Sequence, residues 1–118
     1  GFLRPASLAR LERLAPVNPT RGEGVGGFFC SFGTAVHATG GRDLRRAGCK
    51  SDLFGDGRLR TGHSGSAYGL KSGLWIDRQA GTGLAYFVTA VPPESVGARS
   101  AYSAEEEALV DRASAGMR

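Results

Sequence analysis

The stretch that decides the fold class is residues 61–91, which read TGHSGSAYGLKSGLWIDRQAGTGLAYFVTAV. Apolar residues alternate with small or polar ones through much of it, and this period of two is typical of β-strands. The pattern predicts a short strand over Leu59–His63, a second extended run over Ser66–Asp77 and a return strand over Leu84–Val91. Residues 77–82 form the turn before the return strand, with a glycine where a positive φ is needed.

The second run also predicts which side chains share a face of the sheet. Leu70, Leu74 and Ile76 lie two residues apart or a multiple of two, together with Tyr68 and Ser72, so they are expected on one face. The opposite face holds Gly73 and Trp75, and the tryptophan and the phenylalanines are expected in the core. Asp77 is expected to cap the turn that follows.

The preceding part of the chain predicts one further strand. Residues 26–38 alternate, and one face would carry Phe28, Cys30, Phe32, Thr34 and Val36. Gly40 and Gly41 are expected to end this strand. Residues 42–57 give no clear pattern, and a short edge strand over Lys50–Phe54 within a loop is compatible with them.

Helices are predicted at both ends of the chain. Pro5–Ala15 has proline in the first turn, a leucine stripe and a proline directly after it. In the C-terminal helix, Ser103–Ala115, Ser103 and Glu106 have the spacing of a capping box. The elements together predict an α+β fold in which an antiparallel sheet is flanked by the N- and C-terminal helices.

Composition restricts the class of protein. The 118 residues allow one domain, and no apolar run approaches the roughly 18 residues of a membrane span. The net charge is +4, and the densest basic cluster contains Arg42, Arg45, Arg46 and Lys50. This cluster fits a solvated loop or an anion-binding patch. No aromatic residue interleaves with it to stack on bases, so nucleic acid is not an expected partner.

The two cysteines, Cys30 and Cys49, lack the spacing of a metal site, and we expect neither a metal nor another cofactor. Both a disulfide in an exported protein and two buried thiols remain compatible with the sequence. His37, near a predicted strand end, is expected to be a surface or hydrogen-bonded histidine without a catalytic role.

Residues 61–70 gather the groups with chemical potential. They contain a titratable imidazole, two serine hydroxyls and glycines that permit close approach of a substrate to the backbone. Taken alone, the same residues also fit an ordinary strand with a glycine bulge.

The motifs His63-Ser64-Gly65, Tyr68-Gly69-Leu70, the run 72–77 and Gly81-Thr82-Gly83 resemble the C-terminal part of serine β-lactamase-like hydrolases. The resemblance is closest to the class C branch, which includes DD-peptidases, D-aminopeptidases and esterases. It implies the C-terminal portion of a β-lactamase/transpeptidase-like fold, so residues 1–118 would form a single incomplete domain. It also implies acyl-enzyme chemistry without a cofactor, and slightly favours a periplasmic or secreted protein.

The resemblance implies a role for each residue of the motif. His63 stands where the family usually has lysine and would bind an anionic group or assist proton movement. Ser64 would orient the substrate, Gly65 would leave room beside the acyl group, and the Ser66 N–H would be one donor of the oxyanion hole. Tyr68 would border the substrate cleft.

The family's nucleophile motif, Ser-x-x-Lys, is absent, since no serine is followed by lysine three positions later. The Tyr-x-Asn or Tyr-x-Ser element is absent too. We therefore expect a companion polypeptide segment that carries Ser-x-x-Lys, and a small-molecule or peptide substrate with an ester, amide or β-lactam. The chain alone would be inactive. A non-catalytic binding module on the same scaffold is the alternative, and a small basic nucleic-acid-binding domain is a weaker one.

Overall fold

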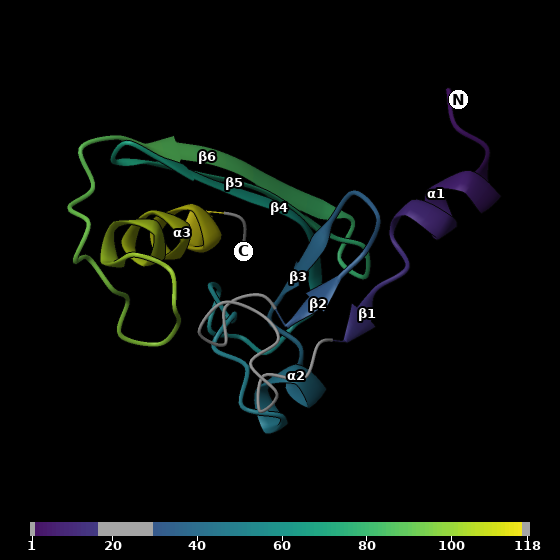
Figure 1. The fold of residues 1–118 in the computed structure, drawn as a ribbon, viewed down its shortest axis with the longest axis horizontal. Helices are drawn as coiled ribbons and strands as arrows, with labels where there is room; N and C mark the ends of the chain where they lie inside the picture. The colour runs from purple at the N-terminus through teal and green to yellow at the C-terminus, as the bar shows by residue number, and fades with distance from the viewer. Residues whose placement is uncertain (1, 17–29, 117–118) are drawn as a thin grey trace.

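The computed structural model describes residues 2–16 and 30–116. Its strands form one antiparallel sheet in the order β1-β2-β3-β4-β5-β6 (Figure 1). The elements along the chain are α1 (Pro5–Leu11), β1 (Ala15–Pro16), β2 (Ser31–Phe32), β3 (His37–Thr39), α2 (Arg42–Arg46), β4 (Arg60–Ala67), β5 (Leu70–Asp77), β6 (Thr82–Val88) and α3 (Ala104–Gly116). The expected α+β class with an antiparallel sheet and a C-terminal helix is confirmed.

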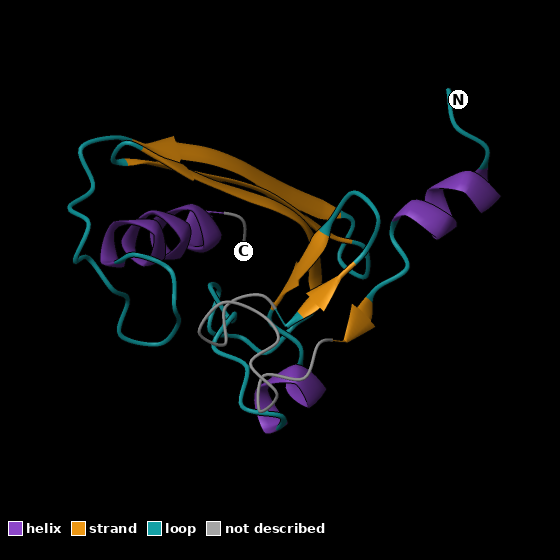
Figure 2. Ribbon diagram, viewed as in Figure 1, coloured by secondary structure: helices purple, strands orange, loops and turns teal. Residues whose placement is uncertain are grey.

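A meander of three long strands, β4, β5 and β6, dominates the sheet (Figure 2). The extended run expected over Ser66–Asp77 is wrong, because the chain reverses at Tyr68 and Gly69. Both residues have positive φ, 51° and 77°, as the two central residues of a type I′ turn do. Tyrosine is an unusual residue at such a position, which hid the turn in the sequence.

The strand expected over residues 26–38 is also wrong in its described part. Residues 26–29 lie outside the described residues, and β2 and β3 are two short strands joined by a turn, with Phe32 paired to His37. Gly33 makes this turn possible, since an added Cβ would lie 2.7 Å from the Leu11 carbonyl oxygen. Gly40, with φ 73°, and Gly41, with φ 94°, follow β3 and end it as expected.

Residues 42–57 form a compact excursion from the sheet rather than an edge strand. They begin with the short helix α2 and continue as a loop, so the strand considered over Lys50–Phe54 is not formed. Cys49 is joined to Cys30 by a disulfide, which settles the alternative that the sequence left open. Asp52 holds the end of the loop, since its carboxylate accepts the N–H groups of Gly55 and Gly57.

The core lies between the meander and α3, which covers one face of the sheet (Figure 1). Trp75 and Tyr86 from the sheet meet Tyr102 and Val110 from the helical side, and Leu53 from the excursion closes the cluster. The burial of Trp75 confirms its expected place in the core.

The predicted capping box is formed at the start of α3. The Glu106 carboxylate accepts the backbone N–H of Ser103, and the Ser103 hydroxyl accepts the N–H of Glu106. Glu106 also accepts the hydroxyl of Tyr86 at 2.7 Å, so the cap is tied to the sheet. Asp77 caps the β5–β6 turn as expected, because its carboxylate accepts the N–H of Ala80.

The N-terminal helix does not flank the meander as expected. α1 ends at Leu11, four residues earlier than predicted, because Ala15 joins β1. None of its residues is buried, and Figure 1 shows it pointing away from β4–β6. Its leucine stripe therefore contributes nothing to the described core.

Candidate functional site

The motif of residues 63–66 lies along an open edge of the sheet. β3 pairs with β4 only at Arg60, Thr61 and Gly62, and no strand of the described residues continues this pairing (Figure 2). On its other side, β4 is paired with β5 as far as Ala67. The second half of β4 therefore has one paired side and one free side.

The register shows which backbone groups point to the free side. A two-residue hairpin loop is closed by a hydrogen-bonded pair, here Ala67 and Leu70. Backbone groups alternate in direction along a strand, so Gly65 and His63 also point to β5. Ser64 and Ser66 then point to the free edge, so the Ser66 N–H, which is expected to be an oxyanion donor, is directed outward.

Ser64 is held by His37, for which the sequence predicts no catalytic role. The Ser64 N–H donates to Nε2 of His37 at 3.1 Å, and the Ser64 hydroxyl lies 3.1 Å from the same nitrogen. An acceptor Nε2 requires that the neutral ring of His37 carries its proton on Nδ1. His37 thereby extends the hydrogen bonding of β4 where β3 ends.

Burial keeps His37 neutral. Its side chain is 1% exposed and packs edge-on against Trp75, with ring centroids 4.9 Å apart. Loss of hydration is the main cause that lowers the pKa of its imidazole from 6.5 to about 4, and the neighbouring His63 contributes to this lowering. The expectation of a satisfied histidine is confirmed, although it is buried and not at the surface.

His63 projects to solvent beside this pair. Its Nδ1 lies 2.6 Å from the carbonyl oxygen of Ser64, and its ring centroid lies 5.2 Å from that of His37. Because a carbonyl only accepts, Nδ1 is the donor, and the neutral ring keeps a lone pair on Nε2. That nitrogen can accept a proton at the open edge.

Ser66 has a partner that the sequence analysis missed. The Lys71 ammonium donates to the Ser66 hydroxyl at 2.8 Å, and the two residues face each other across β4 and β5. The signal for this pair was the hairpin turn, since a turn at residues 68–69 places position 71 opposite position 66. Lys71 brings a positive charge next to the outward-pointing Ser66 N–H.

Gly65 and Tyr68, the other two expected site residues, have different surroundings. An added Cβ on Gly65 would lie 2.6 Å from the Ser72 hydroxyl, so a side chain at this position would displace that hydroxyl. Tyr68 is fully exposed at the tip of the hairpin, which strand geometry puts roughly 15 Å beyond His63. The structure thus brings His63, Ser64 and Ser66 together and leaves Tyr68 at a distance.

The sheet face opposite α3 is apolar and exposed. Leu74 is 54% and Phe87 72% exposed, and Leu74 lies in one cross-strand row with His63 and Ala85. No helix of the described residues covers this face (Figure 1). The register places Phe32 on the opposite face, together with Trp75.

Comparison with known proteins gives no match: no protein-family model, curated protein or solved structure is significantly similar to the chain. Within residues 2–16 and 30–116, no three side chains of metal-binding type gather into a possible ion site. The same residues contain no helix that is both long and apolar enough to cross a membrane.

Proposed function

We propose that this chain contributes one wall of the acyl-transfer site of a serine hydrolase, whose attacking hydroxyl comes from a segment outside residues 1–118. The proposal depends above all on the edge of β4, where the N–H of Ser66 points outward within a few residues of the exposed imidazole of His63. An unpaired edge with an outward amide and a proton acceptor is what an acyl substrate requires on one side.

The chemistry divides between the two segments. The hydroxyl oxygen of the companion would form a bond to the acyl carbon of an ester, amide or β-lactam as the C–O or C–N bond breaks. The hydroxyl proton would pass to the alcohol or amine, which leaves from an ester or amide and stays attached in an opened β-lactam. Water would then hydrolyse the acyl-enzyme and restore the hydroxyl. In both steps the negative charge on the acyl oxygen would be stabilised by the Ser66 N–H, a contribution of roughly 3–4 kcal/mol for one such donor.

His63 would bind an anionic group of the substrate or move a proton near the nucleophile. Its neighbour His37 would act as a positioning residue, because it holds the Ser64 N–H and hydroxyl and so fixes the backbone beside His63. Gly65 and Ser64 would line the path of the substrate along the edge.

The uncovered apolar face supports a companion segment. Leu74 and Phe87 are exposed on this face, and Leu74 lies directly opposite His63 in the neighbouring strand. Monomeric proteins rarely leave such an apolar surface open without a function. The companion that supplies the hydroxyl would cover this face and close the cleft over the edge.

Labelling with a fluorophosphonate probe tests the proposal. The coding sequence around this chain is searched for Ser-x-x-Lys, and the chain is expressed with that segment and also alone. We expect covalent labelling of the combined protein on a serine outside residues 1–118, located by mass spectrometry, and no labelling of the chain alone. If a gene without Ser-x-x-Lys encodes the protein and no probe reacts, the chain is a binding module.

A second arm tests the role of His63 in the combined protein. We expect His63→Ala to lower the rate of labelling at least tenfold, and His63→Lys to restore part of it, since lysine is the usual residue at this position of the resembling family. The side chain is exposed, so unfolding midpoints of both variants should equal that of the unchanged protein. Equal labelling rates would remove His63 from the site.

A further inference from the structure

The positive charge of the chain is concentrated in the excursion between β3 and β4. Residues 42–50 hold four basic side chains, Arg42, Arg45, Arg46 and Lys50, against the single carboxylate of Asp43. Four positive charges minus one negative charge leave +3 in nine residues, compared with a net charge of +4 for the whole chain.

These cations differ in their partners from Arg58, Arg60 and Arg99. Arg58 and Arg60 contact Asp77, and Arg99 contacts Asp111. Among the described residues, no carboxylate forms an ion pair with Arg42, Arg45 or Lys50. Arg46 has only Asp43 at 3.7 Å, and that pair is almost fully solvated. The charges of the excursion are therefore available to an external anion.

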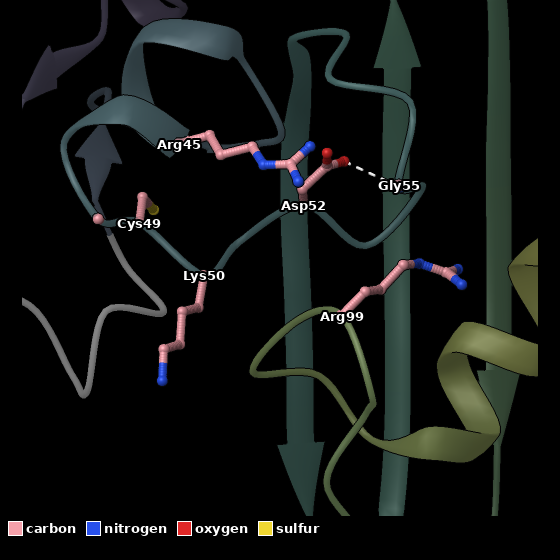
Figure 3. A pocket seen from close by; sticks show the side chains of 7 residues that line it. Arg45, Cys49, Lys50, Asp52, Gly55 and Arg99 are labelled. Atoms are coloured by element: carbon pink, nitrogen blue, oxygen red, sulfur yellow. Dashed lines mark hydrogen bonds between the residues drawn. The ribbon is translucent and has the colours of Figure 1, made fainter.

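The three arginines line a single hollow. Arg42, Arg45 and Arg46 surround a cavity of about 590 Å³ together with Gly55, Asp56 and Gly57. A second cavity of about 350 Å³ adjoins it and shares Arg45 and Gly55 (Figure 3). Figure 3 shows Arg45 reaching over Asp52 between α2 and the loop, whereas Arg99 points away toward α3.

The acidic residues near the hollow already have their hydrogen bonds. Asp52 accepts the N–H groups of Gly55 and Gly57 at 3.0 and 3.1 Å. Asp56 accepts both terminal nitrogens of Arg60, which is the largest cause that lowers its pKa to about 2. Because both carboxylates already accept hydrogen bonds from other donors, they compete less with a bound anion for the three arginines.

The backbone around the hollow is anchored on both sides. Cys49 is bonded to Cys30, and its N–H donates to the carbonyl of Leu44 at 3.0 Å. The carbonyl of Lys50 accepts the N–H of Ala101 at 2.8 Å. The loop that carries the arginines is therefore fixed to the rest of the domain before any ligand arrives, which reduces the entropic cost of binding.

We propose that this hollow, defined by Arg42, Arg45, Arg46, Gly55 and Gly57, binds a phosphate oxyanion with more than one negative charge. A guanidinium offers two parallel N–H donors to the oxygens of a phosphate. Three guanidinium groups offer more donors and more charge than a single carboxylate needs, so they suit a phosphate with more than one negative charge. The residues that line the hollow include no aromatic ring to stack on a base, so the recognised group is the phosphate and not a nucleobase.

Titration of the full chain with inorganic pyrophosphate at low ionic strength, followed by calorimetry, tests the site. We expect saturable binding of one pyrophosphate per chain, at least tenfold weaker in Arg45→Gln. The matched control is Arg10→Gln on the exposed helix α1, which removes the same charge from another surface and should change the affinity less than twofold. Equal weakening by both variants, or no saturation, would overturn the proposal.

Two further arms sharpen the result. Arg45→Lys keeps the charge but loses the pair of parallel N–H donors, so we expect its affinity for pyrophosphate to lie between those of the unchanged chain and Arg45→Gln. Single-stranded DNA distinguishes a small phosphate ligand from a polymer. If DNA binds through Arg45 and pyrophosphate does not, the surface recognises a polyanion and the proposed site is wrong. Circular dichroism verifies that each variant is folded.

Discussion

The two faces of the β4–β6 meander have similar amounts of apolar side chain but opposite surroundings. On the α3 side, Trp75 is fully buried, and its neighbours Tyr86 and Val110 complete a closed core. On the other side, Leu74 and Phe87 come from the same two strands and remain largely exposed. Alternation along β5 and β6 thus produces two apolar faces, of which this chain covers one.

The difference shows that hydrophobicity in a strand does not identify its buried side. Leu74 precedes Trp75 in β5, and either face fits the sequence equally well. Only the position of α3, joined to the sheet through the Tyr86–Glu106 hydrogen bond, determines which one is closed. The stability of the isolated chain should therefore depend on the closed face, and binding of the proposed companion segment on the open face.

The largest effect is expected on the closed face. Trp75→Ala removes the biggest fully buried side chain and should lower the free energy of unfolding by roughly 3–5 kcal/mol. Leu74→Ala, one residue away on the open face, is the matched control and should cost less than about 1 kcal/mol. Urea denaturation measures both, and similar losses would show that the open face is buried in solution.

An intermediate effect is expected at His37, which packs against Trp75 on the closed face. Its folded pKa, about 4, lies below the unfolded value of 6.5, so the unfolded chain binds the proton more tightly. The free energy of unfolding should therefore be unaffected by His37 above pH 6.5. It should decrease as the pH falls from 6.5 to 4, by at most about 3 kcal/mol.

The groups that face His37 are the imidazole of His63, Ser64 and the rings of Trp75 and Phe32. His37→Gln should flatten the loss of stability between pH 6.5 and 4, whereas His63→Gln should leave most of it. NMR titration of the two imidazoles checks the assignment directly. A titration midpoint of His37 near 6.5 in the folded chain would contradict it.

A smaller effect is expected from the helix that closes the core. Ser103→Ala removes the hydroxyl that caps α3 and should destabilise the chain by about 1 kcal/mol. Ser114→Ala, near the other end of the same helix, serves as the control because it lies far along the chain from the cap at Ser103. Thermal unfolding distinguishes the two, and equal midpoints would mean that Glu106 holds the helix start without Ser103.

The smallest effect on stability is expected from the open face itself. Phe87→Ser exchanges an exposed ring for a small polar group and should change the free energy of unfolding by less than about 0.5 kcal/mol. The same change should raise the solubility of the isolated chain, since it removes part of an exposed apolar patch. A clear loss of stability would show that the face is not open.

The sequence was sufficient for local features whose signals lie a few residues apart. Three such features were predicted and are present: the capping box at Ser103 and Glu106, the turn cap at Asp77, and the end of a strand at Gly40–Gly41. Each depends on short-range geometry, because a side chain satisfies backbone groups within three or four positions. The period of two in β5 likewise predicted which side chains share a face.

Long-range choices came only from the tertiary structure. The pairing of Cys30 with Cys49 and the contact of His37 with Ser64 join residues far apart in the sequence, whose partners no local pattern indicates. The pairing of Ser66 with Lys71 depends on where the hairpin reverses. The sequence determined alternation and caps because these are properties of neighbouring residues. Which face α3 covers, and which edge of β4 stays free, are properties of the packed whole.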